Sequence, residues 1–174
     1  MKKVNEALVS SFKMTLHSGR SIDVFEPKPE EIDISDIAHA LSHLCRWGGH
    51  CPKFYSVAQH SVLCSHEKGT TEEQFEFLMH DASEAYMADL PRPIKHRIPV
   101  YREVEDHVLS IILKKFGLSE ELSPRTKEVD NIILTIEHEN FFLKEECEFE
   151  CWGPEKSKKE FLKRFNELYS LLND

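Results

Sequence analysis

Residues 78–93 read LMHDASEAYMADLPRP, and ionisable side chains interrupt the apolar pattern of this stretch at His80, Asp81 and Glu84. A helix turns about 100° per residue, so these three side chains fall on roughly one side of a single helix. Their apolar neighbours indicate that this side is partly buried. Buried carboxylates need partners, and a metal ion is one of the few partners that can serve several of them at once.

The composition predicts one domain that spans residues 1–174, because a chain of this length with 40% hydrophobic residues can form a proper core. A net charge of −9 argues against binding to polymeric nucleic acid, which needs a basic surface, but leaves room for one small phosphorylated ligand. The longest apolar runs, such as 131–136, are too short to span a bilayer, and residues 1–12 contain no long apolar stretch. We therefore expect a cytoplasmic protein with no membrane contact and no secretory signal.

The chain has five cysteines, an odd number at irregular spacing, which fits a reduced cytosolic protein better than a disulfide framework. Cys147 and Cys151 have the spacing of half a metal site. No second pair in the sequence completes such a site, so ordinary thiols are the interpretation that we favour for all five.

The pattern along the chain predicts an all-α bundle with one small β-hairpin near the N-terminus. Weak alternation on either side of the turn HSGR predicts strands at Met14–Leu16 and Ile22–Phe25. Apolar residues then recur at helical spacing from residue 37 to residue 44, with Ser35 as the N-cap of this first helix. Further helices are expected at residues 56–66, 71–87, 101–117, 128–146 and 156–174.

Four side chains that suit a metal ion lie on three of these helices. His60 lies within an apolar stripe, and Asp130 borders another. The helix between them supplies His80 and Asp81 as neighbours. Two imidazoles and two carboxylates can converge at the core of a bundle, where they would suit Mn, Fe, Co, Ni or Zn better than Mg. An inward histidine is more often a hydrogen-bonded core residue, so spacing alone leaves a metal site and a structural core as alternatives.

Three motifs give the chain a resemblance to a known superfamily. SVAQHS at 56–61, LMHDASEAYMADLPRP at 78–93 and EVDN at 128–131 resemble, in that order, the signature of the HD-domain phosphohydrolases: a histidine, a His-Asp doublet and a distant aspartate. CRW at 45–47 and the DLP turn after the doublet resemble the 5′-deoxynucleotidase branch. The chain also resembles the compact phage dATP triphosphohydrolases of this branch, which accompany genomes that replace adenine by 2-aminoadenine. The likeness covers about residues 20 to 140.

The resemblance implies a compact HD-domain helical bundle around one or more catalytic divalent metal ions, drawn from Co, Mn, Zn, Fe, Ni or Mg. It assigns His60, His80, Asp81 and Asp130 as the metal ligands. Such an ion lowers the pKa of bound water and neutralises charge on phosphorus. Glu84 would then be catalytic, either by orienting the attacking water or by moving a proton.

The resemblance also implies a set of substrate-binding residues around the metal. Arg46 would clamp the substrate phosphate, Trp47 would pack beside the deoxyribose, and Asp89 would contact the sugar 3′-hydroxyl or act catalytically on the attacking water. Beyond this set, four basic residues could steer or bind a longer phosphate tail: Lys53, Arg92, Lys95 and Arg97. A helix-terminal charge at Arg46, a core role for Trp47 and a solvated basic face for the lysines are the structural alternatives.

The activity that the resemblance favours is hydrolysis of dATP to deoxyadenosine and triphosphate, with dADP and dAMP as further substrates. A 5′-deoxynucleotidase that acts on deoxynucleoside monophosphates without base preference breaks the same bond and is the first alternative. A non-catalytic nucleotide-binding regulator and a structural helical protein without a metal are the others. Members of the family form dimers or larger rings, so we expect a homo-oligomer with residues 140–146 or the last helix as contact surfaces.

Overall fold

The computed structural model describes residues 13–173, and its first element is a two-stranded antiparallel hairpin. β1 (Lys13–Thr15) pairs with β2 (Ser21–Asp23), with Met14 opposite Ile22. Ile22 is fully buried, so the hairpin packs onto the helical core. The predicted hairpin is confirmed, and both strands begin one residue earlier than the alternation indicates.

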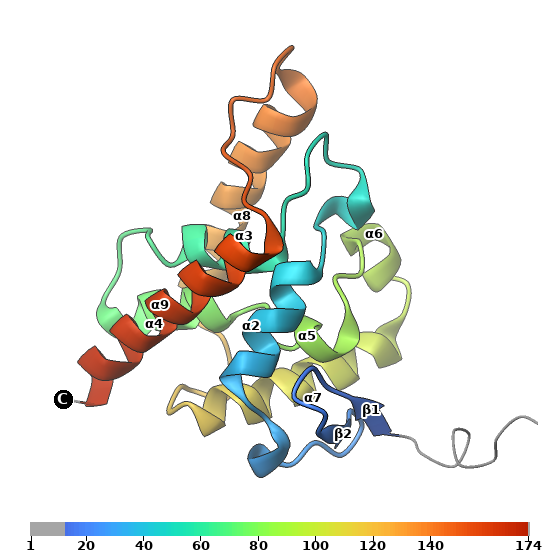
Figure 1. The fold of residues 1–174 in the computed structure, drawn as a ribbon, viewed down its shortest axis with the longest axis vertical. Helices are drawn as coiled ribbons and strands as arrows, with labels where there is room; N and C mark the ends of the chain where they lie inside the picture. Colours follow the sequence, from blue (N-terminus) through green and yellow to red (C-terminus); the bar gives the residue numbers. More distant parts are fainter. Residues whose placement is uncertain (1–12, 174) are drawn as a thin grey trace, which may run out of the picture.

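The remaining described residues are mostly helical, which confirms the predicted all-α class with a small hairpin (Figure 1). The helices are α2 (Ile34–His43), α3 (Val57–Cys64), α4 (Thr71–Met79), α5 (Glu84–Met87), α6 (Arg92–Lys95), α7 (Pro99–Lys115), α8 (Pro124–His138) and α9 (Pro154–Asn173), with 3₁₀ turns η1 (Pro29–Glu31) and η2 (Trp47–Gly49) and a π-helical turn η3 (Glu139–Leu143). α9 packs against α2, α3 and α4, whereas α8 packs against α3 and α4.

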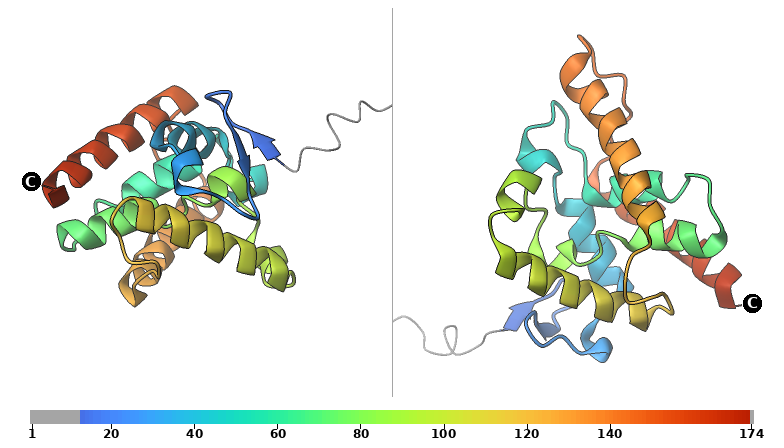
Figure 2. Two further views of the ribbon diagram at one scale, coloured as in Figure 1. Left: turned by 90° about the horizontal axis from the view of Figure 1, so that it is seen from below. Right: turned by 180° about the vertical axis from the view of Figure 1, so that it is seen from behind.

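One large apolar cluster holds the helices together. Seen from below, α7 and α9 lie on opposite edges of the molecule, with α2 and α4 between them (Figure 2). Fully buried side chains fill this space, among them Leu41 of α2, Leu78 of α4, Ile112 of α7 and Phe161 of α9. Burying one such side chain stabilises the fold by roughly 1.5–3 kcal/mol. The core therefore fixes α3 and α4, from which polar side chains project.

α8 is anchored at its start and projects from the bundle at its carboxyl end, where η3 extends it (Figure 1). The Ser123 hydroxyl caps its first turn by accepting a hydrogen bond from the Thr126 N–H. The chain then returns towards α9 along α3, where Gln59 holds it. The Gln59 side chain donates to the Glu150 carbonyl oxygen at 2.6 Å and accepts from the Trp152 N–H at 2.8 Å.

The third predicted helix is wrong in one respect, because residues 71–87 do not form a single helix. α4 and α5 are separate and are joined by turns over residues 80–83, closed by hydrogen bonds from residue i+3 to residue i. The His80 side chain gives the reason, since its Nδ1 hydrogen-bonds the Phe77 carbonyl oxygen at 2.7 Å. In a continuous helix that oxygen would accept from the Asp81 N–H, so the competing bond tightens the chain into a turn.

Other helix ends differ from the predictions by a few residues. Asp33, not Ser35, is the N-cap of α2, because its carboxylate accepts from the Ser35 N–H. α8 begins at Pro124, earlier than predicted, since proline suits the first position of a helix. The short α6 is not predicted at all, because a single turn has no periodicity to detect. Asp174, the end of the predicted last helix, lies outside the described residues.

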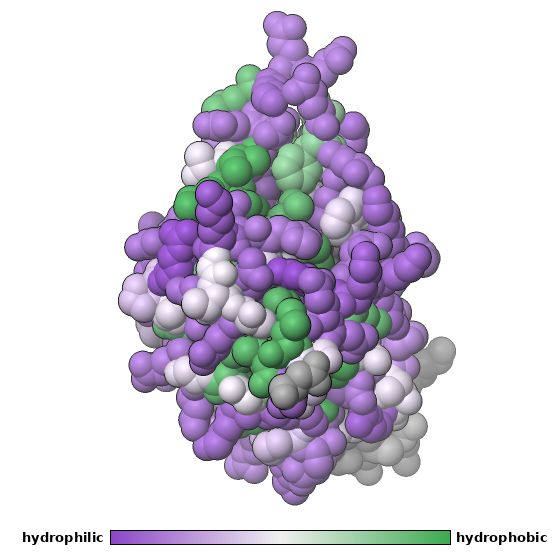
Figure 3. All heavy atoms as spheres, turned by 90° about the vertical axis from the view of Figure 1, so that its left-hand side faces the viewer, coloured by the Kyte–Doolittle hydropathy of each residue, from purple (hydrophilic) through white to green (hydrophobic). Residues whose placement is uncertain are grey.

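Exposed apolar side chains fall in patches on a surface that is otherwise largely hydrophilic. Figure 3 shows one face with apolar residues gathered near its middle. Phe142 and Leu143 of η3 and Leu171 and Leu172 of α9 are exposed. They belong to the two segments expected to make oligomer contacts, and those contacts stay a prediction.

Among the described residues no helix is long and apolar enough to cross a membrane. Residues 1–12, for which we expect no secretory signal, lie outside that part of the chain.

Candidate metal centre

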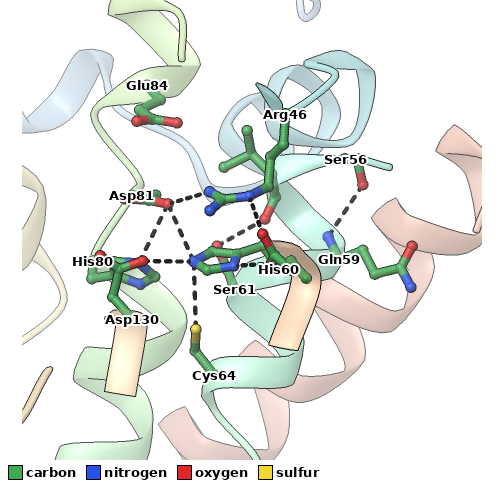
Figure 4. A network of polar contacts seen from close by, with 12 residues as sticks. Arg46, Ser56, Gln59, His60, Ser61, Cys64, His80, Asp81, Glu84 and Asp130 are labelled. Atoms are coloured by element: carbon green, nitrogen blue, oxygen red, sulfur yellow. Dashed lines mark hydrogen bonds and ion pairs between the residues drawn. The ribbon is translucent and has the colours of Figure 1, made fainter. Parts of the chain in front are cut away.

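Three segments of the fold bring the four predicted ligands together (Figure 4). α3, capped by the Ser56 hydroxyl, carries His60, and α8 carries Asp130. The turn after α4 supplies His80 and Asp81. His60 is fully buried and His80 is 7% exposed, whereas the side chains of both aspartates are 19% exposed. The imidazoles therefore belong to the core, and the carboxylates have access to solvent.

The four ligand atoms lie close enough to share one ion. Nε2 of His60 is 3.2 Å from Oδ1 of Asp130 and 3.8 Å from Oδ2 of Asp81. Nε2 of His80 is 3.3 Å from Oδ2 of Asp81 and 3.9 Å from Oδ1 of Asp130. An ion that binds such atoms at about 2.1 Å holds neighbouring ligand atoms about 3.0 to 3.4 Å apart. The spacing therefore fits a single divalent ion after small adjustments of the side chains.

The second ring nitrogen of each histidine is already engaged. Nδ1 of His60 lies 2.5 Å from Oε1 of Glu137, and Nδ1 of His80 lies 2.7 Å from the carbonyl oxygen of Phe77. Both partners are acceptors, so each Nδ1 donates and each Nε2 faces the centre. Nε2 of His80 is buried and has no hydrogen-bond partner among residues 13–173, although Oδ2 of Asp81 lies 3.3 Å away. A metal ion satisfies such an orphaned nitrogen, so the residues fit one.

The ionisable side chains at this centre shift one another's pKa values. Burial alone would lower the pKa of His80, but Asp81 raises it to about 9. Burial also opposes a charge on His60, yet nearby groups led by Cys64 and Glu137 raise its pKa well above the usual value. Burial would raise the pKa of Asp81, but the two histidines hold it far below its usual range. The imidazoles and carboxylates therefore favour each other's charged forms, and because metal ligands must be deprotonated, metal binding at this centre would depend on pH.

Cys64 is a further side chain at this centre, although the sequence interpretation treats it as an ordinary thiol. It follows His60 by one turn on α3, and its Sγ lies 3.5 Å from Nε2 of His60 (Figure 4). The ligand atoms of His60, Cys64 and His80 all lie within 4.8 Å of one another, and all three residues are buried. This buried cluster can hold a metal ion.

Glu137 connects the centre to the loop after α2. Its side chain is fully buried and accepts from four donors. Oε1 accepts from the Tyr55 hydroxyl at 2.8 Å and from Nδ1 of His60. Oε2 accepts from Nε of Arg46 at 3.2 Å and from Nε1 of Trp47 at 3.3 Å. This hydrogen-bond hub orients a predicted metal ligand and two predicted substrate-binding residues at once.

Helix spacing gives a signal for both of the residues that sequence reasoning missed. Cys64 follows His60 by four residues on α3, and Glu137 follows Asp130 by seven residues on α8. Both spacings return to the same face of a helix, so each missed residue lies on the side that carries a predicted ligand.

Arg46 and Trp47 lie beside the centre, where the sequence predicts substrate-binding residues. Arg46 is 7% exposed, and its Nη1 lies 3.4 Å from Oδ2 of Asp81, so its guanidinium spans the distance from Glu137 to a predicted metal ligand. Trp47 adopts a φ of +59°, which is uncommon for a residue other than glycine, and its ring packs against Phe142. Strained backbone of this kind clusters at functional sites.

Two cavities open beside the centre and share Asp81, Glu84, Lys95 and Asp130. The Arg46 cavity, about 440 Å³ in volume, is further lined by Arg46, Trp47, Asp89, Leu90, Pro91, Arg92, Pro93 and Leu134. The Ser123 cavity, about 480 Å³ in volume, is further lined by His80, Ser83, Glu105, Asp106, Leu109, Leu122, Ser123, Pro124, Thr126 and Lys127. The candidate centre therefore has open space on two sides.

Glu84 is placed to hold or pass a proton next to the centre. It is 5% exposed, and its Oε2 has no hydrogen-bond partner in the described part of the chain. Burial, followed by Asp81 and Asp89, raises its pKa well above the usual value. Lys95 lies 3.4 Å from Oε1 of Glu84 and 2.8 Å from Oε1 of Glu105. Burial would lower the pKa of Lys95, but these carboxylates raise it, so the ammonium group stays charged.

Asp89 also lines the Arg46 cavity, and burial raises the pKa of its carboxyl group. One basic residue, Lys53, differs from the expectation for a phosphate tail. Lys53 lines neither cavity, because it is exposed and donates to the Cys147 carbonyl oxygen at 3.2 Å. The structure therefore does not bring Lys53 to the candidate centre. Arg92 does reach it, and its Nη2 lies 2.9 Å from Oδ2 of Asp130.

Two bacterial proteins are similar to this chain. It is 42% identical over 126 residues to the uncharacterized protein YfdR of Escherichia coli K12, and the match covers 72% of this chain and 70% of YfdR. It is 36% identical over 110 residues to an uncharacterized protein of Rhodobacter capsulatus, and that match covers 58% of this chain and 56% of the relative. No protein-family model matches the chain.

Proposed function

The chain belongs to the same family as YfdR, and we propose that it is a divalent-metal-dependent phosphohydrolase that cleaves the 5′ phosphate ester of deoxynucleotides. The observation that carries this proposal is the approach of Nε2 of both His60 and His80 to within 3.2–3.9 Å of a carboxylate oxygen of both Asp81 and Asp130, beside two cavities. The same ligand set, in the same order along the chain, is the signature of the HD-domain phosphohydrolases, to which the proposal assigns this protein.

The residues around the centre suit hydrolysis at phosphorus. A divalent ion would supply an activated water and neutralise charge on the phosphate. Glu84, with one buried oxygen free and a raised pKa, would orient the attacking water or move a proton. Arg46 would bind a phosphate oxygen through its outer nitrogens while Glu137 holds its Nε in place.

The Arg46 cavity suits the nucleoside part of a substrate. Trp47, Leu90 and Leu134 give it apolar walls against which a deoxyribose and a base can pack. Asp89 offers a carboxyl group to the sugar 3′-hydroxyl. A 2′-hydroxyl would meet the Trp47 ring, so ribonucleotides are expected to be poorer substrates.

The Ser123 cavity favours a triphosphate over a monophosphate. It offers about 480 Å³ beyond the residues that both cavities share, and Lys95 and Lys127 line it together with Glu105 and Asp106. A monophosphate would leave this space unused, whereas the outer phosphates of a triphosphate would occupy it. We therefore favour hydrolysis of dATP to deoxyadenosine and triphosphate, with adenine selected by the walls of the Arg46 cavity.

A substrate panel tests the proposal. Metal-free protein is reloaded with Co²⁺ or Mn²⁺ and incubated with each deoxynucleoside triphosphate and monophosphate, and the products are separated by anion-exchange chromatography. We expect triphosphate and deoxyadenosine from dATP at the highest rate. Orthophosphate from monophosphates alone would instead identify a 5′-deoxynucleotidase, and equal rates on all bases would remove the adenine preference.

Two controls connect turnover to the metal centre. Chelation should stop the reaction, and so should Asp130→Asn, which removes one ligand charge. Glu128→Gln is the matched variant, because this glutamate lies on the same helix, its side chain is largely exposed, and it pairs with Arg125 at the surface. Turnover that survives both chelation and Asp130→Asn would refute the proposed mechanism.

A further inference from the structure

The thiol of Cys64 faces the candidate metal centre from a position that is buried away from solvent. The residue is 1% exposed, and Figure 4 shows its sulfur pointing towards the His60 ring from α3. Cys64 also packs in a small apolar cluster with Phe77, Val129 and Ile133. The thiol therefore stands at the boundary between the apolar core and the polar centre.

The sulfur is close enough to the histidine nitrogens to share an ion with them. Sγ of Cys64 lies 3.5 Å from Nε2 of His60, and the ligand atoms of Cys64, His60 and His80 lie within 4.8 Å of one another. An ion with a sulfur ligand at about 2.3 Å and a nitrogen ligand at about 2.1 Å holds the two about 3.1 to 3.6 Å apart. His80, whose buried Nε2 has no hydrogen-bond partner in the described part of the chain, belongs to the same group.

We propose that Cys64 is a fifth protein ligand of the metal ion and that its sulfur makes the centre select zinc, cobalt or iron over manganese and magnesium. Thiolate ligands favour the softer ions, whereas carboxylates and water suit the harder ones. The inference rests on the proposed function only in requiring a metal ion at this centre. It adds the identity of a ligand and a rule for which ions the centre accepts.

Nearby cations make a third anionic ligand tolerable. Two carboxylates already neutralise a divalent ion, so a thiolate would leave the centre with one excess negative charge. Arg46 lies 3.4 Å from Asp81, and Arg92 lies 2.9 Å from Asp130, which offsets that charge. The arginines thus allow a sulfur ligand in addition to the carboxylates.

Cobalt binding gives a direct readout. Thiolate ligation of Co²⁺ produces a sulfur-to-metal charge-transfer absorption in the near ultraviolet, and nitrogen and oxygen ligands alone do not. We expect this absorption in wild-type protein and its loss in Cys64→Ala, with the weaker visible bands of bound Co²⁺ retained. Cys45→Ala is the control, because Cys45 and Cys51 have sulfurs 3.5 Å apart and are the alternative place for a thiophilic ion.

Metal affinity and wild-type spectroscopy complete the test. Cys64→Ala should weaken Zn²⁺ binding by about tenfold or more and leave Mn²⁺ binding within about twofold. X-ray absorption of the wild-type zinc protein, which needs no variant to fold, should show one sulfur neighbour at about 2.3 Å.

The outcomes separate this inference from the proposed function. A bound metal with only nitrogen and oxygen neighbours would overturn the role of Cys64 and leave the hydrolase proposal standing. A charge-transfer absorption that persists in Cys64→Ala and disappears in Cys45→Ala would also overturn it. Failure of the wild-type protein to bind any divalent ion would refute both.

Discussion

Glu137→Gln tests the hydrogen-bond hub behind the candidate metal centre. Glutamine keeps the shape of the side chain but replaces one acceptor oxygen with an amide group. Whichever way the amide turns, two of the four donors around residue 137 lose their acceptor. Hydrogen bonds to a charged partner contribute about 1.5–3 kcal/mol each, so the loss amounts to about 3–6 kcal/mol. Breaking a buried ion pair, here with Arg46, costs a similar 3–5 kcal/mol, roughly.

We therefore expect Glu137→Gln to lower the free energy of unfolding by about 4 kcal/mol, a large part of the roughly 5–15 kcal/mol typical of a domain. Urea unfolding of the metal-free protein, followed by circular dichroism, measures it. With a slope of about 2 kcal/mol per molar, the midpoint should fall by about 2 M. Glu139→Gln, an exposed glutamate two residues further on, should change stability by less than about 0.5 kcal/mol. A midpoint for Glu137→Gln equal to that of the wild type would refute the hub.

Three further predictions concern the same region. The pKa of Glu84 is raised in the folded state, so its protonated form stabilises the protein below the unfolded value near 4.5, and that contribution is lost as the pH rises. Glu84→Gln should therefore stabilise the metal-free protein more at pH 8 than at pH 5, as measured by urea unfolding. The same variant should lower turnover. Ala88 has a φ of +68°, so Ala88→Gly should raise stability by about 1 kcal/mol in thermal unfolding, and a destabilised variant would contradict the strain. Asp81→Ala should abolish turnover and Trp47→Ala should mainly relax discrimination against ribonucleotides; wild-type rates from the Asp81 variant would exclude the mechanism.

Helices with a continuous apolar stripe could be predicted from the sequence, because the residues that they bury are the ones that recur at helical spacing. α7 ends where Gly117 adopts a φ of +82°, and α9 buries Phe161 and Phe165 at helical spacing. The break between α4 and α5 could not be predicted in this way. It depends on a bond from the His80 ring to the Phe77 carbonyl oxygen, which hydrophobic periodicity does not encode.

The candidate ligand set could be predicted only in part from local spacing. His80 and Asp81 stand out because they interrupt an apolar run, whereas His60 and Asp130 needed the resemblance to a known signature. Glu137 shares a helix face with Asp130, but that spacing does not reveal its role, since its four donors come from residues 46 to 60, far away along the chain. Its importance follows from the packing of α8 against α3, which is a property of the tertiary structure.

The His60 ring shows why this packing and the chemistry depend on each other. α8 holds the ring at both nitrogens, through Glu137 at Nδ1 and Asp130 at Nε2. A rotation of α8 by one residue would turn both carboxylates by about 100° away from the ring. A cation entering the centre would replace the contact between Nε2 and Asp130 but leave the bond to Glu137 intact. The ring would therefore stay directed at the ion, which is the requirement for a preformed metal ligand.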